Sequence, residues 1–122
     1  MSTTAADHLR YAGNHLRRFA KDDYPSSLRL GLAGMCLEEI VVALLQGESV
    51  DDPPHGLSSQ CRLLREMGAI DAQQAHLMQR IIGLLPGCSG RDETAEERLP
   101  QLLDLLRNLL ASVTPENGDS MR

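Results

Sequence analysis

The sequence predicts an all-α protein, a four- to five-helix up-down bundle built around one apolar helix at about residues 26–45. Three observations support this prediction. Leu, Ala, Glu, Arg and Gln, which favour helices, are frequent, whereas β-branched residues are few. Apolar residues recur at three- and four-residue steps along several segments. The 122 residues suit a single domain, which we place at residues 1–113, followed by a disordered polar tail at 114–122.

The first helix is expected between Thr4 and Lys21. Thr4 and Asp7 have the spacing of a capping box, in which each side chain accepts a hydrogen bond from the other residue's backbone N–H. Pro25 ends the segment, because the residue before a proline is kept out of the α region. The apolar stripe of this helix consists of Leu9, Ala12, Leu16 and Phe19.

The second helix, at about residues 26–45, has almost no polar face. Ser26 or Ser27 is expected to be its N-cap. A helix that is apolar on nearly all sides is buried on all sides, so we expect it at the centre of the bundle or covered in part by a second subunit. Gly31 and Gly34 are expected to let a neighbouring helix approach closely.

A third helix is expected at about Leu57–Met67, after an exposed loop with two consecutive prolines. Asp71 is expected to cap a fourth helix, with Gln74 at the capping-box position. The last helix is expected from Thr94 to about residue 113. Pro100 leaves two alternatives there: residues 94–98 form a separate turn and Pro100 falls in the first turn of the main helix, or the helix bends at Pro100.

The formal charge of −5 argues against a nucleic-acid-binding protein, because such proteins need a basic surface. Four basic residues nevertheless crowd the first helix: Arg10, Arg17, Arg18 and Lys21. A solvated helix face is the favoured interpretation, and an RNA-facing strip is the alternative that stays open. No cysteines have the spacing of a zinc site or a disulfide framework. The sequence shows no secretory signal and no membrane span, so we expect a cytoplasmic protein.

Glu38 and Glu39 interrupt the apolar helix and are the first candidates for chemistry. Their side chains point about 100° apart, so at most one of them easily escapes burial in the core. A buried carboxylate could act as a general acid or a ligand. The alternative, which we favour, is a carboxylate at the edge of the bundle that pairs with Arg17, Arg18 or Arg65.

The four histidines show no metal-ligand pattern. His8 and His15 share a helix face, but they lie about 10 Å apart along it, which is too far for one metal ion. His55 and His76 have no evident ligand partner. Neither a nucleophile elbow nor a phosphate-binding loop is present, and we expect no metal and no cofactor.

One pattern extends over much of the chain. The apolar helix with its two carboxylates (SLRLGLAGMCLEEIVVALL) is followed by GLSSQCRLLREMGAIDAQQAHLMQRI and by a Leu-rich last helix opened by DETAEE. This order, over roughly residues 25–110, resembles the HEPN-like helical bundles, including the mannitol-repressor group. Catalytic HEPN proteins are metal-independent ribonucleases with an Arg-x4–6-His motif. Arg80 matches the arginine, but residues 84–87 hold no histidine, so the resemblance implies a non-catalytic bundle for dimerisation or partner binding.

The leading hypothesis is a non-catalytic, self-associating protein-interaction module, and the resemblance implies a bacterial regulatory or conflict system. We expect contact surfaces on the second and last helices, with Glu38, Glu39 and Arg80 as interaction residues. Two alternatives stay open. One is a HEPN-type ribonuclease that uses Arg10 and His15, which match the motif spacing within the first helix. The other is an RNA-binding small subunit of a nucleoprotein complex that uses the basic residues of that helix.

Overall fold

A computed structural model describes residues 4–21, 23–85 and 95–114. These residues form five α helices and no strand: α1 (Ala5–Phe19), α2 (Ser26–Gly47), α3 (Leu57–Glu66), α4 (Ala72–Leu84) and α5 (Ala95–Val113). The prediction of an all-α bundle is confirmed. Within the described residues, no helix combines the length and apolarity that crossing a membrane requires. Thr94, the expected cap of the last helix, and residues 115–122 of the expected tail lie outside the described residues.

Short-range hydrogen bonds fix where α1 and α4 begin. The Thr4 hydroxyl accepts a bond from the Asp7 backbone N–H at 3.1 Å, and the Asp7 carboxylate accepts one from the Thr4 backbone N–H at 3.0 Å. Asp71 and Gln74 make the same reciprocal pair at α4, at 2.7 and 2.9 Å. Both predicted capping boxes are confirmed.

α2 begins without a side-chain cap. Pro25 is its N-cap and Ser26 is already helical, so the predicted serine cap is wrong. The reason is that the fixed φ of proline suits a helix boundary, so the helix starts directly after it. The Ser26 hydroxyl donates instead to the Glu96 carboxylate of α5 at 3.0 Å. The first turn of α2 also contains no acidic residue, so its own helix supplies no negative charge to its N-terminal N–H groups.

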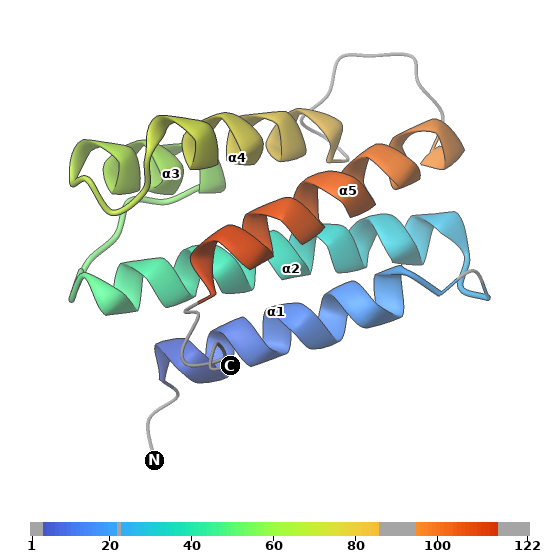
Figure 1. The fold of residues 1–122 in the computed structure, drawn as a ribbon, viewed down its shortest axis with the longest axis horizontal. Helices are drawn as coiled ribbons and strands as arrows, with labels where there is room; N and C mark the ends of the chain where they lie inside the picture. The colour runs from blue at the N-terminus through green and yellow to red at the C-terminus, as the bar shows by residue number, and fades with distance from the viewer. Residues whose placement is uncertain (1–3, 22, 86–94, 115–122) are drawn as a thin grey trace, which may run out of the picture.

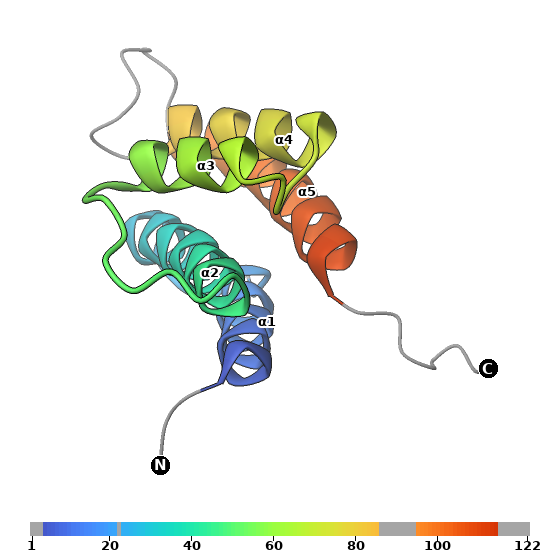
Figure 2. The same cartoon turned by 90° about the vertical axis from the view of Figure 1, so that its left-hand side faces the viewer.

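α1 and α2 form an antiparallel pair, and α5 packs against α1, α2 and α4 (Figure 1). In the view turned by 90°, α3 and α4 lie above this pair and α5 lies at one side of it (Figure 2). On the side of the α1–α2 pair that faces away from α5, Figure 2 shows no other helix of the described chain. We call that uncovered side the outer face.

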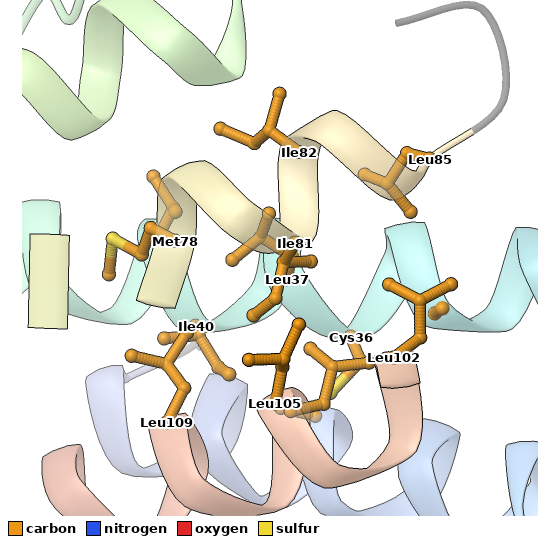
Figure 3. Packing of buried hydrophobic residues seen from close by; sticks show 14 of the residues in the cluster. Cys36, Leu37, Ile40, Met78, Ile81, Ile82, Leu85, Leu102, Leu105 and Leu109 are labelled. Atoms are coloured by element: carbon orange, nitrogen blue, oxygen red, sulfur yellow. The ribbon is translucent and has the colours of Figure 1, made fainter. Parts of the chain in front are cut away.

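The core lies where α2, α4 and α5 meet, and its side chains are aliphatic (Figure 3). Leu37 and Ile40 of α2 are fully buried there, as are Met78 and Ile81 of α4. The leucines of α5 complete the core, and five of them are at most 5% exposed: Leu99, Leu102, Leu105, Leu106 and Leu109. The Leu-rich side of α5 therefore packs within the chain and is not exposed.

α5 continues through Pro100, which lies in its second turn. The alternative in which residues 94–98 form a separate turn is therefore wrong. Proline removes one backbone N–H donor from the helix ladder. The side-chain amide of Gln101 donates to the Glu97 backbone carbonyl at 3.1 Å and adds a donor beside that missing bond.

Gly31 and Gly34 are not points of close helix approach within the chain. A Cβ atom added at Gly31 would meet no atom within 4 Å. One added at Gly34 would meet Leu85 Cδ2 at 3.9 Å, which is an ordinary van der Waals distance. The expected role of the two glycines is wrong for packing within one chain, because other α2 residues carry the contacts with neighbouring helices.

Candidate functional site on the outer face of α1 and α2

The outer face exposes large apolar side chains of α2. Leu28 and Met35 are 48% and 45% exposed, and they lie two turns apart on one side of the helix. Gly31 lies between them and is also exposed. We call Leu28, Gly31 and Met35 the apolar strip. Within one chain α2 is therefore not buried on all sides, because α1, α3, α4 and α5 cover only its other sides. The alternative in which a second subunit covers part of α2 stays a prediction.

Tyr11 of α1 is a further exposed large side chain, and it is linked to α2 through His8. Its side chain is 37% exposed, and its ring packs edge-on against the His8 ring with 6.0 Å between centroids. His8 in turn contacts Glu39, one turn after Met35 on α2. In the described chain, the other exposed large hydrophobic side chain is Met67, at the end of α3. Such a grouping on one face is typical of a contact surface.

A partly buried group of His8, His15 and Glu39 joins the two helices, and we call it the imidazole–carboxylate cluster. His8 Nδ1 lies 2.6 Å from Glu39 Oε1, and His15 Nε2 lies 3.9 Å from Glu39 Oε2. An ionised carboxylate only accepts hydrogen bonds, so the geometry places a proton on His8 Nδ1. The other ring nitrogen of His8 faces the Gln46 amide nitrogen at 3.5 Å.

The cluster has one feature of an acid–base site, namely an imidazole oriented by a carboxylate. It does not extend to a metal centre, since no three His, Cys, Asp or Glu side chains of the described residues are placed to hold an ion. His15 Nδ1 is buried and has no hydrogen-bond partner. These contacts tie α1 to α2 one turn beyond Met35.

Glu39 pairs with histidines, so the expected pairing of these glutamates with Arg17, Arg18 or Arg65 is wrong. The cause is the antiparallel packing, which turns the His8 and His15 side of α1 towards α2. His8 and His15 lie two turns apart on α1, yet a ring nitrogen of each lies close to an oxygen of the same Glu39 carboxylate. Glu38 is exposed and makes no hydrogen bond or ion pair with any part of the chain that the structure describes.

Cys36 lies one turn before Glu39 and is fully buried. Burial, with a smaller contribution from the Glu39 charge, raises the pKa of its thiol from 9.0 to about 12. Burial alone raises the pKa of Cys61 to about 11. Both groups therefore stay protonated at neutral pH, which makes them poor nucleophiles.

The four basic residues of the first segment are exposed, and Arg17, Arg18 and Lys21 lie within about one turn of one another. Arg10 donates to the Asp7 carboxylate at 2.8 Å, so its charge is partly neutralised. Arg17 bonds to the Asn14 side chain, and Arg18 and Lys21 are exposed. Arg10 and His15 lie about 140° apart around the helix, so the two residues of the ribonuclease alternative point to different sides.

Arg80 lies apart from both glutamates. It lines a groove of about 290 Å³ between α4 and α5, together with His76, Gln79, Gly83, Leu84 and Gln101. Glu39 faces α1 instead. The structure therefore does not bring the three expected interaction residues together at one site.

The apolar strip was not among the expected site residues, although the sequence holds a signal for it. Gly31, Met35 and Glu38 follow at one-turn spacing, and a glycine and a charged residue on one line of an otherwise apolar helix mark its solvent side. No local signal indicates the contacts of Glu39, because they depend on how α1 crosses α2.

Comparisons with protein families, with curated proteins and with solved structures find no match for this chain. The resemblance to the HEPN-like bundles therefore stays a prediction.

Proposed function

We propose that the protein is an interaction module that self-associates, with the apolar strip and Tyr11 as its contact surface. One observation carries this proposal: the most apolar helix of the bundle leaves Leu28 and Met35, which lie two turns apart on one side of it, about half exposed. Large half-exposed side chains grouped on one face favour a protein contact over a role in the fold of one chain.

The surface differs from the one expected from the sequence. The leucines of α5 lie in the core, and no large hydrophobic side chain of the described part of α5 is among the exposed ones. The contact is therefore assigned to α2 with α1, and not to α2 with α5. The imidazole–carboxylate cluster serves this surface by holding α1 in place beside the strip.

The exposed fractions predict a weak contact. Complete burial of a Leu or Met side chain contributes about 1.5–3 kcal/mol, and each of these two still has roughly half of that to gain. Two copies together would gain about 3–6 kcal/mol from these four side chains, with a further contribution from Tyr11. Loss of rotational and translational freedom opposes binding by at least about 4 kcal/mol. These four side chains alone therefore leave the net free energy of association near zero, and Tyr11 and the polar rim of the contact have to supply the rest. We take a dissociation constant of about 0.1–1 mM, which corresponds to about −5.5 to −4.1 kcal/mol, as the range to be tested.

Sedimentation velocity over a range of about 0.02–2 mM protein, centred on that constant, tests the proposal. The average sedimentation coefficient should rise with concentration for the native chain. Met35→Glu should abolish the rise, because it places a charge in the apolar strip. Met67→Glu is the matched control, since Met67 is 43% exposed but lies at the end of α3, outside the strip. A native chain that stays monomeric at the highest concentration overturns the proposal, and equal effects of both substitutions overturn the assigned surface.

A further inference from the structure

We infer that the partner of the apolar strip is the same strip of a second copy, packed antiparallel, with Leu28 of each copy against Met35 of the other across Gly31. This inference rests on the proposed function and specifies its geometry. It uses three observations: the spacing of the large side chains, the open space at Gly31, and the position of Glu38.

The strip is complementary to itself under a two-fold axis. In a symmetric dimer, residue i contacts residue j of the partner, and residue j contacts residue i of the partner. An axis that passes α2 between positions 31 and 32 places position 28 opposite position 35. Each exposed leucine then meets an exposed methionine, so both large side chains of both copies are covered at once.

Gly31 lies at the centre of that contact. It is exposed, and a Cβ atom there would meet nothing within 4 Å, so no group of its own chain fills the space between Leu28 and Met35. Small residues between larger ones let two helix backbones approach closely and leave a hollow for side chains of the partner. Within one chain this glycine has no packing role, whereas in the antiparallel pair it has one.

Charge favours the antiparallel orientation over the parallel one. Glu38 is exposed one turn after Met35 and has no partner among the described residues. In a parallel pair the two Glu38 carboxylates would lie side by side and repel each other. In the antiparallel pair Glu38 falls level with Pro25 of the other copy, at the start of its α2. The two Glu38 carboxylates then lie at opposite ends of the contact and no longer repel each other, while the Glu96 carboxylate of the same chain accepts from the Ser26 hydroxyl at that helix start.

Disulfide trapping in the full chain tests the arrangement, with Cys88→Ser as background, because Cys36 and Cys61 are buried. Leu28→Cys and Met35→Cys chains, one of them carrying a mass tag, are mixed and oxidised at about 1 mM, the upper end of the expected dissociation constants. The mixed disulfide should form several times faster than either homodimer. Both substitutions replace exposed side chains, so the fold should persist, which circular dichroism would check. Predominant Leu28→Cys homodimers would indicate a parallel pair and overturn the inference.

A second measurement separates this inference from the proposed function. Gly31→Ala should weaken self-association several-fold, whereas Gly34→Ala, one turn later on α2 and facing Leu85, should leave it unchanged. Concentration-dependent sedimentation without a preferred mixed disulfide would refute the antiparallel register and leave self-association standing. A native chain that never associates would refute both.

Discussion

Replacing Gly31 by alanine should make the monomer more stable, although glycine is the native residue. Gly31 lies inside the 22-residue helix α2, and the added Cβ would meet no atom within 4 Å. Alanine in a helix interior is favoured over glycine by about 0.5–1 kcal/mol, chiefly because the unfolded glycine has more backbone freedom to lose. With no steric cost to subtract, we expect nearly that full amount as a gain in the free energy of unfolding.

For a domain of this size, such a gain corresponds to a rise in Tm of about 2–5 °C. Circular dichroism at about 5 µM chain would measure it, because the protein is monomeric far below a dissociation constant of 0.1 mM. Gly34→Ala is the matched control, since its Cβ would make an ordinary contact with Leu85 at 3.9 Å and should stabilise to a similar degree. A fall in Tm for Gly31→Ala at this concentration would show that the space beside Gly31 is occupied and would refute the reasoning.

Further measurements test the contacts of Glu39 and the burial of the two thiols. Glu39→Ala should lower the free energy of unfolding by about 1–3 kcal/mol, because it leaves partly buried imidazoles without their acceptor. Glu38→Ala should change the free energy of unfolding by less than about 0.5 kcal/mol. Urea unfolding of both variants measures the difference, and equal effects would contradict it. The thiols of Cys36 and Cys61 should resist a thiol reagent at pH 8 in the folded chain and react on unfolding, measured in the Cys88→Ser background. Because burial raises the pKa of Cys36 from 9.0 to about 12, its neutral form is favoured in the folded state. The free energy of unfolding should therefore be lost progressively as the pH rises from about 9 towards 12, and a Cys36→Ala chain with the same alkaline profile would argue against this cause.

Local patterns in the sequence predicted local structure well. The two capping boxes depend on residues three positions apart, so Thr4 with Asp7 and Asp71 with Gln74 could be recognised without knowing the fold. At the start of α2 the cap preference of serine and the boundary set by Pro25 point to different residues, and the structure follows Pro25.

The site was harder to predict, because it depends on tertiary packing. The partners of Glu39 lie 31 and 24 positions earlier in the chain, and only the antiparallel crossing of α1 and α2 brings them together. Because α2 has almost no polar face, its sequence pattern also predicts burial on all sides and does not identify the exposed side. One glycine and one glutamate mark that side, and average hydrophobicity does not register a line of so few residues.

The central claim, that the outer face is a self-association surface, is tested most directly by amide NMR spectra of the native chain recorded between about 0.05 and 2 mM, which bracket the expected dissociation constant. We predict that the amides of Leu28, Gly31 and Met35 shift with concentration, while those around Met67 and Arg80 stay fixed. Spectra that do not change over this range, or shifts that centre on Met67 or Arg80, would contradict the claim.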